Sequence, residues 1–132
     1  MNRPRILLVD DEEVFARNMS RLLDRRGYSV TAVHSGDAAV HALENEPYSL
    51  MILDLKMPGM DGIVTLKAVR KLGLFVQTLI LTGHGSIDSA LEAVKLGAYD
   101  YLTKPCGVEQ LVAKIEVALQ EKTPWVDATH LS

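Results

Sequence analysis

Short apolar runs and longer patterns of helical spacing alternate along the chain. Runs at residues 6–9, 50–53 and 76–81 are dominated by apolar side chains, which is typical of strands buried on both faces of a sheet. Runs at residues 28–33 and 98–102 alternate apolar and polar side chains, as strands with one face near solvent do. The pattern therefore predicts three central strands and two edge strands.

Each run is followed by apolar residues three or four positions apart, which is the spacing of an amphipathic helix. The apolar faces predicted in this way are Phe15, Met19, Leu22 and Leu23; Ala39, Val40 and Leu43; Val64, Ala68, Val69 and Leu72; Ile87, Leu91 and Val94; and Val108, Leu111, Ile115, Ala118 and Leu119. Helices are expected to begin after Ser35, Asp61 and Ser86 and to end at Gly27, Gly73 and Gly97. Repeated strand–helix units imply a parallel sheet with right-handed crossovers.

The two kinds of strand also constrain the order of the sheet. The order 2-1-3-4-5 places the apolar strands in the centre and the alternating strands at the edges. This is the flavodoxin-like (βα)5 arrangement, an α/β fold with a doubly wound parallel sheet. Its ligand crevice opens at the carboxyl ends of the first and third strands, so a functional site is expected there.

Composition and charge narrow the classes of function. The 132 residues suit one domain, and the formal net charge of −3 argues against a broad nucleic-acid surface. No apolar run approaches the ~18 residues of a membrane span, and the first run is too short for a signal peptide. The single cysteine, Cys106, is interpreted as a small apolar residue. We expect a cytoplasmic protein that binds neither nucleic acid nor membrane directly.

Polar residues gather where the predicted strands end: Asp10 and Asp11 after the first, Asp54 after the third, Thr82 after the fourth and Lys104 after the fifth. Each has an ordinary interpretation on its own, the Asp pair as a helix N-cap cluster, Thr82 as a loop residue and Lys104 as a surface lysine. Three carboxylates at one edge, however, repel one another and favour a divalent cation. Oxygen ligands with room for water and a phosphate oxygen suit Mg²⁺.

The formal charges of this edge indicate a phosphoryl acceptor. The three carboxylates, Lys104 and Mg²⁺ sum to zero, so metal and ammonium together could stabilise an added dianionic phosphoryl group. Aspartate is a known nucleophile for phosphoryl groups. The central position of its strand makes Asp54 the candidate phosphoacceptor.

Four motifs make the chain resemble the receiver domain of two-component response regulators over nearly its whole length. They are Leu-Val-Asp-Asp-Glu (8–12), Leu-Asp-Leu-Lys-Met-Pro-Gly-Met-Asp-Gly (53–62), Leu-Thr-Gly-His-Gly (81–85) and Gly-Ala-Tyr-Asp-Tyr-Leu-Thr-Lys-Pro (97–105). Residues 83–86 and 95–100 look most like receivers of multidomain transcription activators. The resemblance implies a receiver domain at 1–122 and a tail or linker start at 123–132.

The resemblance also implies a phosphorylation-controlled switch in a two-component phosphorelay. Asp54 would take a phosphoryl group from a phosphohistidine of a sensor histidine kinase or phosphotransfer protein. Asp10, Asp11, Asp54 and the backbone carbonyl of Lys56 would hold Mg²⁺, with Asp10 acting largely through water. Lys56 and His84 occupy positions that tune phosphate lifetime in this family, although solvated loop residues fit the sequence equally well.

The switch itself is expected to involve Thr82 and Tyr101. Thr82 and Lys104 would contact phosphoryl oxygens, with a cis peptide between Lys104 and Pro105. As Thr82 moves, Tyr101 would turn inward and reshape the face made by the fourth helix, fifth strand and fifth helix. That face would bind a downstream output domain or protein, and it is open to a second copy in a homodimer. Without the motif, Tyr101 is interpreted as an edge-strand aromatic with a wet hydroxyl.

Two other functions stay open at this point. One is a receiver fold that acts only as a docking module and is never phosphorylated, against which the complete acidic set argues. The other is a phosphohydrolase with an aspartyl-phosphate intermediate. Such enzymes usually place a second acid two residues after the nucleophile, where this chain has Lys56. We therefore expect no enzyme activity beyond phosphorylation and dephosphorylation of Asp54 itself.

Overall fold

The computed structural model describes residues 3–57, 59, 61–83 and 87–121. Within them the strands are β1 (Arg5–Val9), β2 (Ser29–Val33), β3 (Leu50–Leu53), β4 (Gln77–Thr82) and β5 (Asp100–Thr103). The helices are α1 (Glu13–Arg25), α2 (Gly36–Asn45), α3 (Gly62–Lys71), α4 (Ile87–Lys95) and α5 (Val108–Gln120). All strand pairs are parallel and the order is β2-β1-β3-β4-β5, as the burial pattern predicts.

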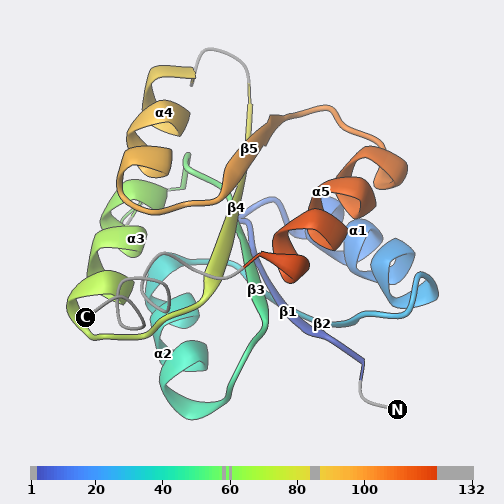
Figure 1. Cartoon of the computed structure of the whole chain (residues 1–132), viewed down its shortest axis with the longest axis horizontal. Helices are drawn as coiled ribbons and strands as arrows, with labels where there is room; N and C mark the ends of the chain where they lie inside the picture. The colour runs from blue at the N-terminus through green and yellow to red at the C-terminus, as the bar shows by residue number, and fades with distance from the viewer. Residues whose placement is uncertain (1–2, 58, 60, 84–86, 122–132) are drawn as a thin grey trace.

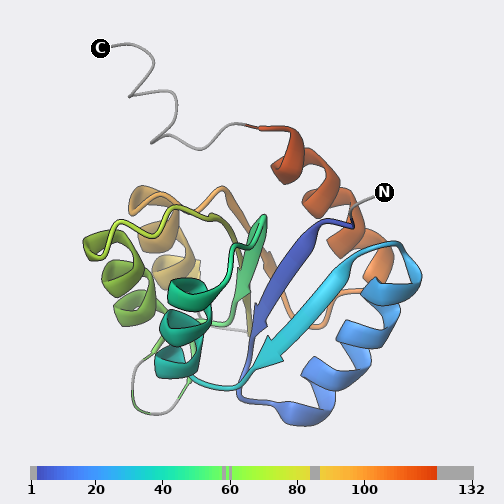
Figure 2. The ribbon, with the colours of Figure 1, turned by 90° about the horizontal axis from the view of Figure 1, so that it is seen from below.

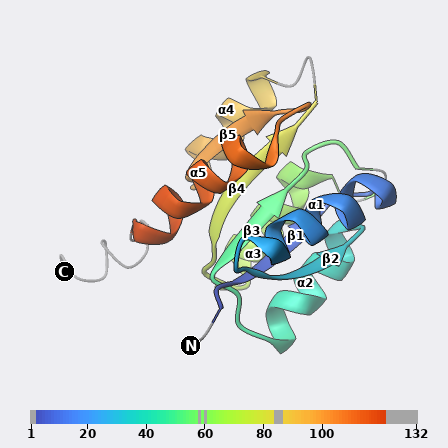
Figure 3. The same cartoon turned by 90° about the vertical axis from the view of Figure 1, so that its right-hand side faces the viewer.

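Helices cover both faces of the sheet (Figures 1 and 2). On one face α1 and α5 lie side by side (Figure 3), over a core that includes Ile6, Leu8 and Ile52. On the other face α2, α3 and α4 cover a core that includes Leu7 and Met51. Successive side chains of a strand point to opposite faces, so a strand covered on both sides favours apolar residues at successive positions. This explains the unbroken apolar runs of β1 and β3.

The predicted apolar face of α3 is wrong in part. Val64 and Leu72 are 48% and 52% exposed, whereas Thr65 and Leu66 are buried. The cause lies at the start of the helix, where Gly62 packs directly against the backbone that follows β3. Because Gly62 faces the sheet, the residues three and four positions later face it too.

Two of the three apolar residues predicted to face inward from α4 lie on its exposed side, and the third, Val94, is partly buried. Ile87 and Leu91 are 49% and 47% exposed, while Ala90 and Ala93 are fully buried against the sheet. Small side chains allow α4 to lie close to the strands and leave its larger apolar residues outside. In α1, Leu22 is likewise 38% exposed although it was expected to face inward.

The predicted helix ends are confirmed where the structure describes them. The side chains of Ser35 and Asp61 each accept a hydrogen bond from a backbone N–H three residues on, at 3.1 and 2.9 Å. The three glycines expected to end helices have positive φ; Ser86 lies outside the described residues. β5 begins at residue 100 rather than 98, because the N–H of Ala98 still bonds back to the end of α4.

The end of α5 is tied to the start of β4. The side-chain amide of Gln77 donates to the carbonyl oxygens of Ala118 at 3.1 Å and Glu121 at 3.4 Å. Gln77 is buried, so these bonds satisfy an amide that would otherwise be costly to bury. The last turn of α5 therefore has a fixed place at the amino edge of the sheet.

Candidate functional site

Backbone hydrogen bonds continue the parallel pairing one residue past three of the strands. The N–H of Asp10 donates to the last carbonyl of β2 and that of Asp54 to the last carbonyl of β1, both at 3.0 Å. The N–H of Lys104 donates to the last carbonyl of β4 at 2.7 Å. These three residues are therefore held in the frame of the sheet, although each follows the end of its strand.

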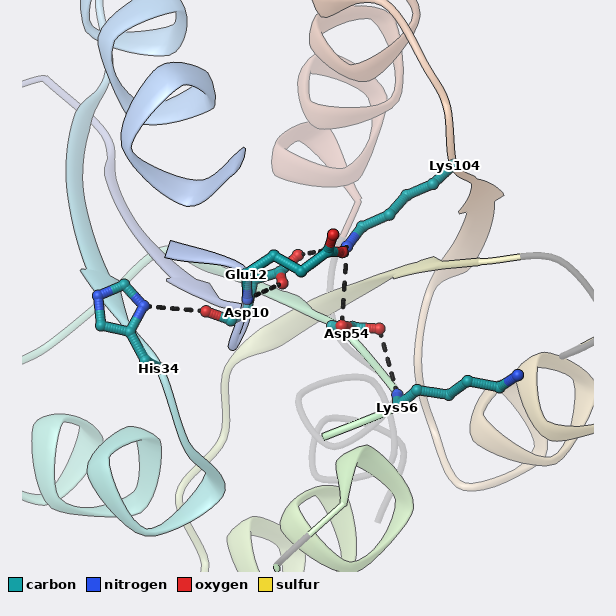
Figure 4. A network of polar contacts seen from close by, with 6 residues as sticks. All are labelled: Asp10, Glu12, His34, Asp54, Lys56 and Lys104. Carbon is teal, nitrogen blue, oxygen red and sulfur yellow. Dashed lines mark hydrogen bonds and ion pairs between the residues drawn. The ribbon is translucent and has the colours of Figure 1, made fainter. Parts of the chain in front are cut away.

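The carboxylates of Asp10 and Asp54 are buried and oriented in the same way (Figure 4). In each, Oδ1 accepts a hydrogen bond from the backbone N–H two residues on, from Glu12 at 2.9 Å and from Lys56 at 3.2 Å. Aspartate side chains commonly close turns of this kind. With Oδ1 fixed, Oδ2 of both residues points toward the side chain of Lys104.

Lys104 is surrounded by three carboxylates and an aromatic ring. Its Nζ lies 2.7 Å from Asp10 Oδ2, 2.6 Å from Glu12 Oε1 and 3.7 Å from Asp54 Oδ2. The ring of Phe15 lies below it, with its centre 4.5 Å from Nζ. The sequence analysis predicted Phe15 only as part of an apolar helix face and assigned neither Phe15 nor Glu12 a role in the site. A signal for Glu12 existed, since it lies two residues after Asp10 where the chain turns into a helix.

Burial is the main cause of the raised pKa of Asp54. It raises the pKa of Asp54 to about 6, and the negative charges of Asp10 and Asp11 act in the same direction. The positive charge of Lys104 and the hydrogen bond from Lys56 oppose the shift but do not cancel it. Asp54 is thus a carboxylate with incomplete charge compensation.

Lys104 remains charged in this setting. Burial disfavours its ammonium form, but hydrogen bonds to Asp10 and Glu12 outweigh burial and raise the pKa of Lys104 above its usual value. The ion pair with Asp10 is the better shielded of the two close pairs, because Asp10 is almost fully buried and Glu12 is exposed. Asp10 therefore contributes more than Glu12 to the electrostatic stabilisation of the Lys104 ammonium group.

Oxygen donors line a pocket of about 240 Å³ beside this ion pair, formed by Asp11, Glu12, Asp54, Lys56, Gly83 and Lys104. Carboxylate oxygens of Asp10, Glu12 and Asp54 lie within 4.8 Å of one another. Hard divalent cations prefer ligands of this type. The acidic group could therefore hold a metal ion.

The other predicted ligands are placed less closely. Asp11 lines the pocket but lies outside this closest group of three oxygens. Lys56 contacts Asp54 through its backbone N–H, and a metal-binding role for its carbonyl stays a prediction. His84 lies outside the described residues.

Thr82 ends β4 at the same edge. Its side chain is fully buried, and within the described part of the chain its Oγ1 has no hydrogen-bond partner. A buried hydroxyl without a partner is costly, and it stays available to a ligand that arrives later. The peptide between Lys104 and Pro105 is cis, as expected.

Tyr101 lies on β5, half-buried, and packs against the core under α3 and α4. On its outer side is a groove of about 920 Å³ between α4, β5 and α5, whose lining includes Ile87, Tyr101, Lys114 and Val117. Cys106 also lines it, and burial raises the pKa of its thiol. An open groove with exposed apolar residues follows directly from the outward face of α4.

Comparison with known families decides the kind of domain. Residues 6–116 match the family described as response regulator receiver domain. The chain belongs to this family. The matched residues contain the carboxylates, Thr82, Tyr101 and Lys104 of the site just described.

Relatives of this receiver domain are transcriptional regulators. It is 37% identical to the transcriptional regulatory protein FixJ of Bradyrhizobium diazoefficiens over 119 residues, which are 90% of this chain and 58% of FixJ. It is 39% identical to ZraR of Escherichia coli in an alignment 131 residues long, which covers 95% of this chain and 30% of ZraR. The matched part of this chain thus spans 58% of FixJ and 30% of ZraR.

Solved structures agree with the receiver fold. The receiver domain of NtrX from Brucella abortus has a TM-score of 0.83 at 29% identity, with 89% of this chain and 99% of that chain covered. The crystal structure of FixJ-N has a TM-score of 0.85 at 28% identity, with 93% and 98% covered. Within the described part of this receiver domain, every helix is too short or too polar to cross a membrane.

Proposed function

We propose that this receiver domain is a switch in a two-component system, in which Asp54 accepts a phosphoryl group from a phosphohistidine. Its support is the unequal compensation of the two buried carboxylates. Asp10 is paired with Lys104 at 2.7 Å, while Asp54 is 3.7 Å away and keeps a pKa raised to about 6. The less neutralised carboxylate is the better nucleophile and the one that faces the pocket.

In the transfer, an oxygen of Asp54 forms a bond to phosphorus while the bond between phosphorus and the histidine nitrogen breaks. The bonding electron pair stays with the histidine ring. Lys104 is already within 3.7 Å of Asp54 Oδ2, so its ammonium group can approach an oxygen of the acquired phosphoryl group. Electrostatic stabilisation of this kind is the main contribution that a protein makes to phosphoryl transfer.

Mg²⁺ would be held by Asp10, Asp11 and Asp54, with the backbone carbonyl of Lys56 as a further ligand. The donor set fits a hard cation, since every side-chain donor is a carboxylate oxygen and two of them are buried. When bound, the ion would neutralise charge on the carboxylates and on the phosphoryl oxygens. Lys56, which lines the pocket, and His84 would act on the lifetime of the phosphorylated state.

The output would pass from Thr82 to Tyr101. Thr82 Oγ1 is buried and without a partner among the described residues, so a phosphoryl oxygen would give it its first hydrogen bond. A shift of Thr82 would leave room for Tyr101 to turn inward and alter the groove between α4, β5 and α5. This is a two-state element biased by a local change of charge.

The partners follow from this scheme. A sensor histidine kinase or phosphotransfer protein would supply the phosphoryl group at the acidic edge, in the cytoplasm. The groove face would bind an output domain or protein, or a second copy of the chain. The domain would comprise residues 1–122, and residues 123–132 would begin a tail or linker.

Labelling with a small phosphodonor, such as acetyl phosphate, tests the proposal. Asp54→Asn should abolish Mg²⁺-dependent labelling, and mass mapping should place the label of the unaltered protein on Asp54. Asp61→Asn is the matched control, because Asp61 is a nearby aspartate whose carboxylate caps α3 instead of facing Lys104. Undiminished labelling of Asp54→Asn would refute the proposal.

A further inference from the structure

Glu12 contacts Lys104 although the proposed function gives it no role. Glu12 Oε1 accepts a hydrogen bond from Lys104 Nζ at 2.6 Å, whereas Asp54 Oδ2 lies 3.7 Å from the same nitrogen. Lys104 is therefore placed on the Asp10 side of the site, away from the candidate phosphoacceptor (Figure 4).

The backbone of Glu12 is held by a hydrogen bond, while its exposed side chain can change partners. Its N–H donates to Asp10 Oδ1 at 2.9 Å, so its Cα has a defined position beside the pocket. Its side chain is 62% exposed, whereas those of Asp10 and Lys104 are 1% and 14% exposed. A contact of this kind contributes modestly and is easily broken when a stronger anion competes for the lysine.

Phosphorylation of Asp54 would introduce such an anion. A phosphoryl group on Asp54 would bring close to two negative charges and strong acceptor oxygens into the pocket that Asp54, Glu12 and Lys104 line together. Those oxygens would compete with Glu12 for the ammonium group of Lys104, which lies 3.7 Å from Asp54 Oδ2, and their charge would repel the Glu12 carboxylate. The buried Asp10 would stay paired with Lys104, whereas the exposed carboxylate of Glu12 can turn toward solvent.

We propose that Glu12 is a positioning residue that holds Lys104 away from Asp54 in the unphosphorylated domain and releases it on phosphorylation. This rests on the proposed function, since it assigns Glu12 an effect on the same site. Glu12 then opposes phosphorylation, because its carboxylate competes with the phosphoryl oxygens for the ammonium group of Lys104.

Glu12→Gln and Glu13→Gln form a matched pair for the test. Both remove one negative charge at the start of α1, but the ion pairs of Lys104 within the described residues go to Asp10, Glu12 and Asp54 and not to Glu13. With a small phosphodonor and saturating Mg²⁺, Glu12→Gln should be labelled about two- to fivefold faster, the range that an exposed ion pair can account for. Glu13→Gln should stay close to the unaltered protein.

The NMR signals of the Lys104 side chain separate this role from a general effect of charge. In the metal-free protein, Glu12→Gln should shift the Lys104 Cε and Nζ resonances, and Glu13→Gln should not. With a beryllium fluoride mimic of the phosphoryl group, the Lys104 resonances of Glu12→Gln and the unaltered protein should coincide, because Lys104 has left Glu12 in both.

Three results would overturn the inference. The first is an equal rate gain in Glu12→Gln and Glu13→Gln, and the second is a Lys104 shift that persists in the mimic-bound state. The third is a loss of Mg²⁺ affinity greater than tenfold in Glu12→Gln, which would make Glu12 a metal ligand instead. Failure of the proposed function looks different, because then neither the unaltered protein nor any variant is labelled on Asp54.

Discussion

The Nζ atom of Lys104 lies 2.7 Å from Asp10 Oδ2 but 3.7 Å from Asp54 Oδ2. The two carboxylates are otherwise alike, since both are buried and both have Oδ1 bound by the backbone N–H two residues on. Because Lys104 lies nearer Asp10, its ammonium group is mainly the counter-ion of Asp10 and leaves the negative charge of Asp54 less neutralised. The asymmetry gives two neighbouring aspartates different chemistry.

The raised pKa of Asp54 should make the metal-free domain less stable as pH rises. Its carboxyl binds a proton more tightly in the folded state, at about 6, than at its ordinary value of 3.8. Below pH 3.8 this difference in pKa does not change the free energy of unfolding. As pH rises from 3.8 through about 6, it lowers the free energy of unfolding progressively. At pH 7.5 the penalty is roughly 3 kcal/mol.

Asp54→Asn should remove this penalty. Urea unfolding without metal should show the variant more stable than the unaltered protein at pH 7.5, with an advantage about 2 kcal/mol larger than at pH 4.5. Asp61→Asn serves as control and should show no such change of advantage with pH. An advantage of Asp54→Asn that does not depend on pH would contradict the assignment.

Mg²⁺ binding should weaken in acid, because the metal ion and a proton compete for Asp54. With a pKa of about 6 for Asp54, calorimetric titration should give roughly tenfold lower affinity at pH 5 than at pH 7.5. A matching release of protons should accompany binding near pH 6. Affinity that is the same at both pH values would mean that Asp54 is not a ligand.

Thr82→Val should separate signalling from stability. The Thr82 hydroxyl is buried without a partner among the described residues, so an isosteric methyl group should change the free energy of unfolding by less than about 0.5 kcal/mol or increase it. Affinity for a phosphoryl mimic should nevertheless fall, because the variant cannot donate to it. Binding of beryllium fluoride, followed by NMR, measures this.

Thr78→Val provides the contrast in the same strand. Thr78 is also fully buried, but its Oγ1 donates to the carbonyl of Val76 at 3.1 Å. Loss of that bond should cost about 1 kcal/mol of stability, with little effect on binding of the mimic. A larger loss of stability in Thr82→Val than in Thr78→Val would show that Thr82 has a structural role.

Gly62→Ala should disturb the backbone that carries Asp54. A Cβ at Gly62 would lie 2.5 Å from the carbonyl oxygen of Asp54 and 2.5 Å from Leu55 Cα, both backbone atoms that cannot move independently. We expect a loss of about 1–3 kcal/mol in urea unfolding and slower labelling of Asp54. Gly107→Ala is the control, because nothing lies within 4 Å of its added Cβ; equal effects of the two would contradict the argument.

The sheet could be predicted from the sequence because burial on both faces favours uninterrupted apolar runs, and such runs are read directly at residues 6–9 of β1, 50–53 of β3 and 79–81 of β4. The direction in which each helix faces was harder to predict. The rotation of a helix depends on close backbone approaches, such as that of Gly62, and on small residues such as Ala90 and Ala93, which an apolar pattern does not rank above Leu or Ile. The exposed apolar face of α4 was missed for this reason.

The site was predictable to the level of which residues share an edge, since parallel strands bring their carboxyl ends together. Distances within it were not predictable. Nothing in the residue types indicates that Lys104 lies nearer Asp10 than Asp54, because this depends on where Lys104 leaves β5 beside the end of β4 and on the contact with the Phe15 ring. Glu12 enters the site for the same geometric reason.

The bonds of Gln77 to the end of α5 have a mechanical consequence. β4 is six residues long, with Gln77 at one end and Thr82 at the other, a length of about 17 Å at the rise of a parallel strand. The buried strand β4 therefore connects the hydroxyl of Thr82, at the acidic edge, to the last turn of α5. The last turn of α5 therefore lies at the edge of the sheet opposite the acidic site.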